Sequence, residues 1–463
     1  MDVFFEQYKP ASSIANYLTL GSKTNGEQTL GFELEHFVVE KGSLAAVPFS
    51  AAAAPVGRVA AGASVENVLE ALKPYYNETV YEEDDEGNSH LFGLGREKAV
   101  ITLEPGAQLE LSIGPAHSVR EIEQLYRAFR EEIDPVLDAR GLRLLELGYH
   151  PTRQARELSL LPKRRYQYMD KYFSHTGSHG ICMMRATAST QVSVDYTSES
   201  DAMTKLRIAN ALGPLFAFIT DNSPVFEGEK VGLLGGTTEV AQSGLAVPRR
   251  MARMVCWSDT DPNRTQIPRG GFDEDFSFLR YAENLVDAPG IFLPAWATGT
   301  ASPEYLGFTT FKQRLADAFL DEDTILHILS LFFYDARFKT YLEIRQADSM
   351  PLDYALAYAA LIRGIFYNPE AQSYFSKQFK YIDSASVAFA LSALRVRGFD
   401  AEVYGRSASE WLDEMVACAR EGLDEEDAGY LVPLAELVAE RRTLLEALHP
   451  LHLEEGREDH AAI

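Results

Sequence analysis

The segment 31–40 (GFELEHFVVE) places two acidic residues at a spacing of two inside an otherwise apolar run. Successive side chains of a β-strand point to opposite faces, so Glu33 and Glu35 share one face while Phe32 and Leu34 lie on the other. We therefore expect a strand with one charged face and one apolar face.

The segment 100–115 (VITLEPGAQLELSIGP) repeats this pattern. Glu104, Gln108 and Glu110 have the same parity along the chain, whereas Leu109 has the opposite one. A protein rarely places four carboxylates on the inner side of hydrophobic strands unless a cation holds them, because buried charges need partners. The two segments together predict a site that binds cations.

Two later segments, 185–196 (RATASTQVSVDY) and 341–347 (YLEIRQA), also alternate between polar and apolar side chains and are predicted to be strands. The polar side chains of these two segments are Arg185, Thr187, Ser189, Gln191, Ser193 and Asp195 in the first, and Tyr341, Glu343 and Arg345 in the second. Four separate strands with one polar face each are most simply combined into one sheet.

The predicted fold is therefore α+β, with an antiparallel sheet that has helices on its apolar face and a charged cavity on the other. Helical periodicity predicts helices at 119–139 and 200–219. Since we find no repeat and no linker, we expect residues 1–463 to form a single catalytic domain, of which 371–463 is a mostly helical C-terminal part.

Crowded carboxylates restrict the chemistry of such a face. Two like charges about 5 Å apart repel by roughly 3 kcal/mol at an effective dielectric constant near 20, so several pairs would rival the stability of a domain, on the order of 10 kcal/mol. Either the carboxylates take up protons or cations lie between them, and oxygen ligands suit Mg²⁺ or Mn²⁺. Arg345 beside Glu343 offers donors to a phosphate oxygen, which favours ATP-dependent phosphoryl transfer. The alternative is that each glutamate is merely solvated on an open sheet face.

The composition restricts the classes of partner that the protein is expected to bind. A formal net charge of −25 argues against nucleic acid as a partner, and we expect small-molecule substrates instead. The three cysteines, Cys182, Cys256 and Cys418, form no CxxC pair or disulfide framework. We see no signal peptide and no membrane span, so we expect a cytoplasmic protein. The expected oligomeric state is a monomer or a homodimer.

Five segments taken in order resemble the plant-type glutamate–cysteine ligase family, which belongs to the carboxylate–amine ligases, and the resemblance implies a glutamine-synthetase-like catalytic sheet with one charged active-site face. They are GFELEHF (31–37), ITLEPGAQLELS (101–112), MMRATASTQVSVDY (183–196), WSDTDPNRT (257–265) and YLEIRQAD (341–348). The resemblance runs from about residue 25 to 370. It implies that ATP phosphorylates the γ-carboxylate of glutamate and that the amino group of cysteine then attacks the γ-glutamyl phosphate. The products would be γ-glutamylcysteine, ADP and phosphate.

The resemblance also implies roles for particular residues. The Mg²⁺ ligands would be Glu33, Glu35, Glu104, Glu110 and Glu343. Arg345 and Arg185 would be catalytic, and Gln108, Gln191, Arg253 and Arg264 would contact substrates. The chain departs from many relatives at Ala107, where they carry glycine.

Three alternatives remain open from the sequence. The first is a γ-glutamyl ligase for a different amine, which a panel of acceptors would reveal. The second is a metal- or nucleotide-binding relative without turnover, against which the intact acidic pairs argue. The third is a paired-carboxylate glycosidase, which needs only two acids and no metal and would keep its activity in EDTA.

Overall fold

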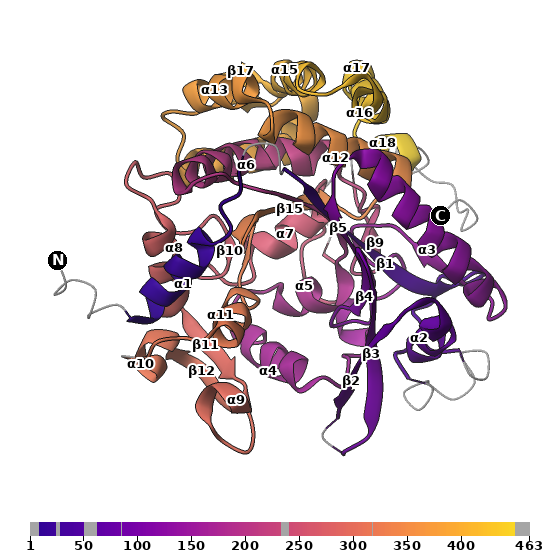
Figure 1. The fold of residues 1–463 in the computed structure, drawn as a ribbon. Helices are drawn as coiled ribbons and strands as arrows, with labels where there is room; N and C mark the ends of the chain where they lie inside the picture. Colours follow the sequence, from indigo (N-terminus) through magenta and orange to yellow (C-terminus); the bar gives the residue numbers. More distant parts are fainter. Residues whose placement is uncertain are drawn as a thin grey trace.

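The computed structural model describes residues 9–24, 28–50, 63–84, 86–232, 240–316 and 318–449, and a nine-stranded antiparallel sheet forms its centre (Figure 1). Eight strands follow one another in the order β14 (Ala336–Phe338), β15 (Leu342–Asp348), β7 (Ser189–Val194), β1 (Leu30–Glu40), β5 (Leu109–Ala116), β4 (Ala99–Leu103), β3 (Ser89–Arg96) and β2 (Glu78–Glu83). The ninth, β6 (Leu142–Leu145), pairs with the outer end of β1. The predicted α+β class is confirmed.

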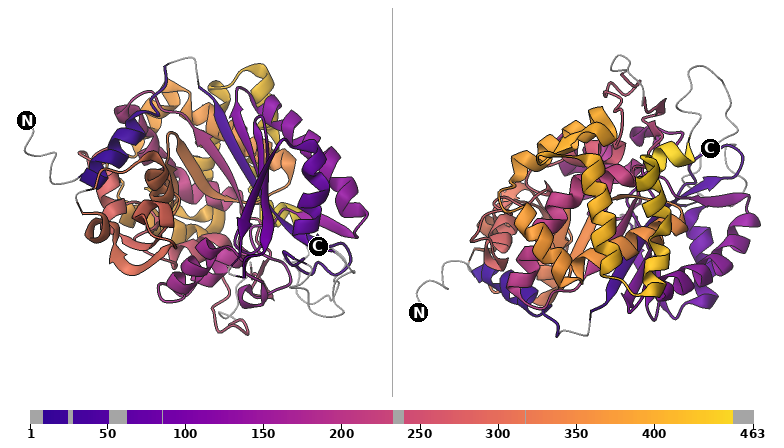
Figure 2. Two further views of the ribbon diagram at one scale, coloured as in Figure 1. Left: turned by 60° about the horizontal axis from the view of Figure 1, so that its bottom comes forward. Right: turned by 90° about the horizontal axis from the view of Figure 1, so that it is seen from above.

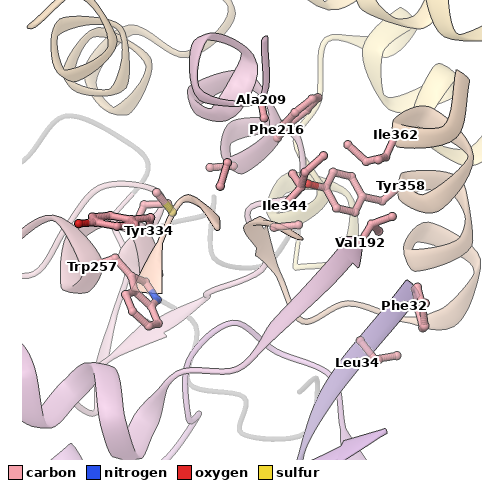
Figure 3. Close-up of a cluster of buried hydrophobic side chains, with 14 of the residues drawn as sticks. Phe32, Leu34, Val192, Ala209, Phe216, Trp257, Tyr334, Ile344, Tyr358 and Ile362 are labelled. Carbon is pink, nitrogen blue, oxygen red and sulfur yellow. The ribbon is translucent and has the colours of Figure 1, made fainter. Parts of the chain in front are cut away.

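Four helices cover the apolar face of this sheet: α2 (Val65–Leu72), α3 (Val119–Asp138), α6 (Glu199–Ile219) and α12 (Leu352–Phe366). The side chains of Phe32, Val192 and Ile344 on this face are fully buried, and Val192 and Ile344 lie beside Tyr358 of α12 (Figure 3). The helices predicted at 119–139 and 200–219 are thus α3 and α6. They begin where Ser118 and Ser198 accept a hydrogen bond from the third residue of the helix, the usual N-cap arrangement.

The chain after residue 368 adds a further helical layer over α6 and α12 (Figure 2). It consists of α13 (Pro369–Gln378), α14 (Ser384–Arg397), α15 (Ala408–Glu421), α16 (Glu425–Tyr430), α17 (Val432–Glu440) and α18 (Leu444–Leu448), with a hairpin of β16 (Glu402–Val403) and β17 (Arg406–Ser407). Because α6 lies between this layer and the sheet, it is apolar almost all round. Residues 450–463 lie outside the described residues, and the single-domain organisation stays a prediction.

Shorter elements lie over the charged face of the sheet. These are α4 (Arg164–Phe173), α5 (Gly180–Ala186), α7 (Ala252–Ser258), β10 (Thr265–Gln266) and β13 (Phe333–Tyr334). The remaining elements are α1 (Lys9–Thr19), α8 (Phe278–Asp287), α9 (Ala295–Thr298), α10 (Phe311–Leu315), α11 (Glu322–Leu329), β8 (Val225–Phe226), β9 (Glu229–Lys230), β11 (Pro289–Leu293), β12 (Glu304–Thr310) and the 3₁₀ turns Lys73–Tyr75, Ala155–Glu157 and Gly398–Asp400. Across the described ranges, no helix is both long and apolar enough to span a bilayer.

The segment 100–115 differs from its prediction, because it forms two strands rather than one. β4 and β5 are joined by a tight turn in which the amide of Ala107 donates to the carbonyl of Glu104 (2.8 Å) and the amide of Glu104 donates to the carbonyl of Gln108 (2.9 Å). The polar parity survives the turn because Thr102 and Glu110 stand opposite each other across the hairpin.

The segment 185–196 also differs from its prediction at its start. Residues 180–186 form α5, and the strand β7 begins only at Ser189. The hydroxyl of Thr187 donates to the carbonyl of Met183 (2.7 Å), which ends the helix before the strand begins. Arg185 therefore belongs to a helix and does not share the polar face of β7.

Candidate active site

A cavity of about 210 Å³ lies between the charged face of the sheet and the helices α4, α5 and α7. The sheet wall of this cavity consists of Glu33, Glu35, Glu104, Pro105, Gln108, Glu110, Gln191, Arg337, Lys339 and Arg345. The helical wall consists of Arg165, Tyr166, Met169, Met183, Met184, Thr187, Trp257, Ser330 and Phe333. Four of the five glutamates predicted from the sequence thus face one space.

Strand register brings Glu35 and Glu110 together, because they are directly opposite in the β1–β5 pair. Cβ atoms of such a pair are about 4.5–5.5 Å apart. Glu35 accepts hydrogen bonds from the amide and hydroxyl of Ser189 (2.7 and 2.9 Å) and from the Gln191 side-chain amide (2.9 Å). Glu110 accepts from the hydroxyls of Thr102 and Ser112 (2.9 and 3.0 Å). The two carboxylates are held in place by neutral donors.

Burial and mutual repulsion raise the pKa values of the carboxyl groups on this wall. Burial and the charges of Glu343 and Glu110 raise the pKa of Glu33 to about 8. Burial and the charges of Glu104 and Glu35 raise the pKa of Glu110 to about 8, and burial with Glu35 raises the pKa of Glu104 to about 7. Without a cation, the cavity therefore holds more negative charge than it can keep ionised at neutral pH.

Glu343 has the opposite character and does not line the cavity. Burial would raise its pKa, but Arg337, Lys339 and Arg345 lower it well below the usual range. Its Oε2 accepts a hydrogen bond from Arg337 Nε (2.6 Å) and lies 3.1 Å from Arg345 Nη1. Glu343 thus stays ionised and fixes two cations of the sheet wall, and as a metal ligand it would first have to exchange these partners.

A β-bulge positions Arg345. The register between β15 and β7 shifts by one residue between Ile344 and Ala347, so the strand carries an extra residue beside the cavity. The guanidinium of Arg345 donates to the Gln191 side chain and lies 5.9 Å from the Trp257 ring centre. Gln191 thereby connects Arg345 to Glu35.

Gln108 lies at the base of the turn between β4 and β5. Its side-chain oxygen accepts from the amide of Gly106 (2.8 Å), and its side-chain nitrogen donates to the carbonyl of Thr187 (2.8 Å). Both groups of the amide are therefore used to hold the turn in place, although the side chain does line the cavity. This favours a structural contribution of Gln108 over direct substrate contact.

Three arginines predicted to act on substrates lie outside the cavity. Arg185 pairs with Asp170 (2.5 Å) and donates to the carbonyl of Leu158 (3.1 Å). Arg264 is fully buried, where it pairs with Asp261 (3.2 Å) and lies over the rings of Tyr172 and Phe332. Arg185 lies on helix α5 and not on the polar face of β7, and neither arginine lines the cavity, so their roles towards substrates stay predictions.

Arg253 contacts the site from outside the cavity. Its guanidinium is buried and donates to the backbone carbonyls of Arg345 (3.0 Å) and Gln346 (3.3 Å) in the β-bulge. These two hydrogen bonds hold the backbone beside Arg345, and the role of Arg253 as a substrate contact stays a prediction.

The sequence did not single out three cationic side chains of the cavity, namely Arg165, Arg337 and Lys339. Arg337 and Lys339 have the same parity along the chain as Glu343 and Arg345. Extending the predicted alternation of 341–347 by four residues towards the N-terminus would therefore have found them. Arg165 comes from helix α4, and nothing in its local sequence marks it.

The donor set fits a hard divalent cation in its chemistry, because carboxylate oxygens with raised pKa values face a common space. Within the described part of the chain, however, no three His, Cys, Asp or Glu side chains come close enough together to enclose a metal ion. Such a cation would need oxygens from a ligand besides one or two of these carboxylates, which is how Mg²⁺ usually binds with phosphates.

A second cavity, of about 370 Å³, adjoins the first at Glu33. Its lining includes Gly31, Phe32, Val100, Ile113 and Tyr341, together with Lys23, Lys98, Ser193 and Asp195 near the same end of the sheet. The two cavities therefore follow one another along β1, the first charged and the second more apolar.

Comparison with known proteins finds relatives of this chain. The chain is 28% identical over 365 residues to a chloroplastic glutamate–cysteine ligase of Medicago truncatula, which covers 77% of this chain and 64% of the relative. The Arabidopsis thaliana protein of the same name is also 28% identical, over 77% of this chain and 62% of the relative. The chain thus spans under two thirds of the length of these relatives.

Among solved structures, the fold is similar to that of a glutamate–cysteine ligase from Francisella tularensis in complex with AMP. The TM-score is 0.53 at 13% identity, over 94% of this chain and 86% of that one. The family described as glutamate–cysteine ligase family 2 (GCS2) matches residues 29–458, which extends the resemblance well beyond residue 370. The chain belongs to glutamate–cysteine ligase family 2.

Proposed function

We propose that this protein joins the γ-carboxylate of glutamate to the amino group of cysteine at the expense of ATP. The observation that carries the proposal is the sheet wall, where four glutamates share one cavity with Arg337, Lys339 and Arg345. The names of the relatives and of the AMP-bound structure support this activity and the use of ATP.

The residues of the sheet wall have complementary tasks in this reaction. Glu33, Glu35, Glu104 and Glu110 would hold Mg²⁺ or Mn²⁺, which would neutralise the charge of the triphosphate. Arg345 and Arg337 face the same space and stabilise negative charge as the γ-phosphoryl group moves from ADP to the γ-carboxylate oxygen of glutamate. The amine nitrogen then attacks the acyl carbon, the bond from that carbon to the phosphate oxygen breaks, and phosphate leaves with the amine proton.

The second cavity suits the nucleoside of ATP. It adjoins the carboxylates at Glu33, so a triphosphate among the glutamates would extend its ribose and base along β1 towards Gly31 and Val100. Gly31 and Ser193 both line this cavity, and a Cβ at Gly31 would lie 3.0 Å from the Ser193 Cβ, so a larger residue would crowd this wall. Glutamate and the acceptor amine would then occupy the first cavity.

A reducing compartment such as the cytoplasm is part of the proposal, because all three cysteines are free and buried. The relatives carry the word chloroplastic in their names, so the compartment depends on the cell and not on the fold. Monomer and homodimer remain the two expected oligomeric states.

The test is release of phosphate from ATP by the purified protein. We expect release that requires glutamate, cysteine and Mg²⁺ together and that EDTA abolishes. No release with this combination would refute the proposal, and release that needs another amine in place of cysteine would establish a different γ-glutamyl ligase. Retention of a glycosidase activity in EDTA would point to the paired-carboxylate alternative.

A further inference from the structure

The helical wall has a composition unlike that of the sheet wall. Three methionines, Met169, Met183 and Met184, and three aromatic residues, Tyr166, Trp257 and Phe333, face the glutamates across the cavity. The Trp257 and Phe333 ring centres are 5.8 Å apart, so the two rings form one surface. Methionine and aromatic rings are polarisable and make favourable contacts with sulfur.

Arg165 is the cationic residue of this wall, and it stands four residues before Met169 on α4. Residues four apart on a helix lie on the same face, so the guanidinium and the thioether border the same part of the cavity. Arg165 donates to the hydroxyl and the carbonyl of Ser330 (2.9 and 2.7 Å), which orients the guanidinium. Burial lowers the pKa of Arg165, whereas the charges of Tyr166 and of Glu104 on the sheet wall raise it.

The indole of Trp257 adds a donor to the same wall. The residue is 8% exposed, it lines the cavity, and its buried Nε1 has no hydrogen-bond partner among the described residues. A buried N–H without a partner costs free energy, so a ligand that accepts a hydrogen bond there would be favoured. Arg253 and Arg345 lie over the indole at 5.6 and 5.9 Å and make this part of the cavity attractive to anions.

We propose that the helical wall recognises the acceptor amino acid, with Arg165 and the Trp257 N–H holding its carboxylate and the methionines contacting its side chain. This inference rests on the proposed function. Glutamate and the triphosphate carry most of the charge and belong with the sheet wall, whereas the acceptor has a single uncharged, small side chain. Its amino group would then point towards the acyl carbon at the sheet wall.

The wall predicts an order of acceptors. An apolar, sulfur-lined pocket accepts a thiol or a methyl group alike but offers no partner to a hydroxyl group, and such pockets discriminate one methylene by about 10–200-fold. We expect cysteine and 2-aminobutyrate to be the best acceptors, alanine to be about tenfold worse in kcat/KM, and serine worse still.

The first experiment changes the size of the pocket. Met169→Ala and Met183→Ala should lower kcat/KM for cysteine about tenfold and improve norvaline relative to cysteine by at least about tenfold, with the KM values for ATP and glutamate unchanged. Met169→Leu and Met183→Leu are the size-matched controls and should keep the order of acceptors. Alanine variants that lose activity equally with all acceptors would overturn the assignment.

The second experiment removes the acceptor carboxylate. Cysteamine lacks this group, so the unsubstituted protein should use it at least about 100-fold less well than cysteine. In Arg165→Ala, activity with cysteine should fall while activity with cysteamine stays the same, so the preference for cysteine over cysteamine should disappear. If Arg165 instead held glutamate, the KM for glutamate would rise and both acceptors would suffer equally.

Trp257→Phe keeps the ring and removes the N–H, so it provides an independent variant should Arg165→Ala fold poorly. It should raise the KM for cysteine severalfold and leave cysteamine unaffected, and an equal effect on both acceptors would count against the proposal. An unsubstituted protein that is inactive with every acceptor would overturn the proposed function and this inference together. Activity whose acceptor preferences do not respond to any of these variants would overturn this inference alone.

Discussion

The sheet wall and the helical wall differ in how their side chains are held. On the sheet wall, strand register fixes each carboxylate against a neighbour, as with Glu35 opposite Glu110, and neutral donors such as Ser189 and Thr102 complete the contacts. On the helical wall, most of the side chains are apolar, and separate short elements bring them together. One wall is therefore suited to hold charge in a fixed geometry, and the other to accommodate the shape of a ligand.

Removing one carboxylate should have the largest effect. Glu35→Gln preserves shape but removes a charge and one of the two acceptor oxygens that bind Ser189 and Gln191. We expect a loss of turnover of about 10³-fold with a loss of stability of only about 1 kcal/mol. The measurement is phosphate release at saturating substrates together with thermal unfolding. Glu40→Gln is a matched control, because Glu40 ends the same strand at a partly exposed position away from the cavity.

Arg345 and Arg185 test the placement of two residues that were predicted to act together. Arg345→Ala should reduce turnover about 10²–10³-fold, because it removes a cation that faces the carboxylates. Arg185→Ala should cost about 1–2 kcal/mol of stability through the lost contacts with Asp170 and Leu158, and turnover should stay within about threefold of the unsubstituted protein. Equal losses of turnover in the two variants would contradict the structure.

These two arginines show what the sequence could and could not predict. Alternation identified the charged face of β1, β5, β7 and β15, because a strand has a fixed period of two residues and each face meets one environment. The same period fits Arg185 by coincidence, since the helix α5 ends just where the alternation begins. The local pattern of polar and apolar residues does not show at which residue a helix or strand ends.

The helical wall was missed for a related reason. Met169, Met183 and Trp257 have the spacing of ordinary core residues, and only the tertiary arrangement exposes them to a cavity. The β-bulge at Arg345 was equally invisible, because a bulge changes the pairing between strands without changing the alternation within one. The fold and the acidic wall of the cavity were therefore predictable, whereas the helical wall was not.

The pH dependence of stability should report the crowded carboxylates. The pKa values of Glu33 and Glu110, about 8, and of Glu104, about 7, exceed the unfolded value near 4.3. The folded state therefore binds more protons between about pH 4.5 and 8, and the free energy of unfolding falls as the pH rises through this window. In the absence of divalent cations, Tm should drop by several degrees from the lower end of this window to its upper end.

Divalent cations should reverse this loss. Mg²⁺ competes with protons for the carboxylates, so together with ATP it should raise Tm more at the alkaline end of the window than at the acidic end. Glu110→Gln removes one of the titrating groups and should flatten the dependence of Tm on pH. A Mg²⁺ effect that is the same at both ends of the window would show that cations bind somewhere other than the sheet wall.

The smallest effect is expected at Ala107, in the turn that carries Glu104 and Gln108. Its φ of 65° is unfavourable for a residue with a Cβ by about 1–2 kcal/mol, which glycine would relieve. Ala107→Gly would also lose about 0.8 kcal/mol of methyl burial and about 0.4–1 kcal/mol through a more flexible unfolded chain. These terms nearly cancel, so urea unfolding should show a change within about 0.5 kcal/mol.

The neighbouring Gly106 provides the contrast to Ala107. A Cβ at Gly106 would lie 2.3 Å from the carbonyl oxygen of Arg185, so Gly106→Ala must displace backbone and should destabilise the protein by more than about 2 kcal/mol. A gain above about 1 kcal/mol in Ala107→Gly would instead mean that strain dominates at Ala107. The turn tolerates alanine at one position and requires glycine at the next because the first side chain has space and the second would meet α5, where the two walls of the cavity touch.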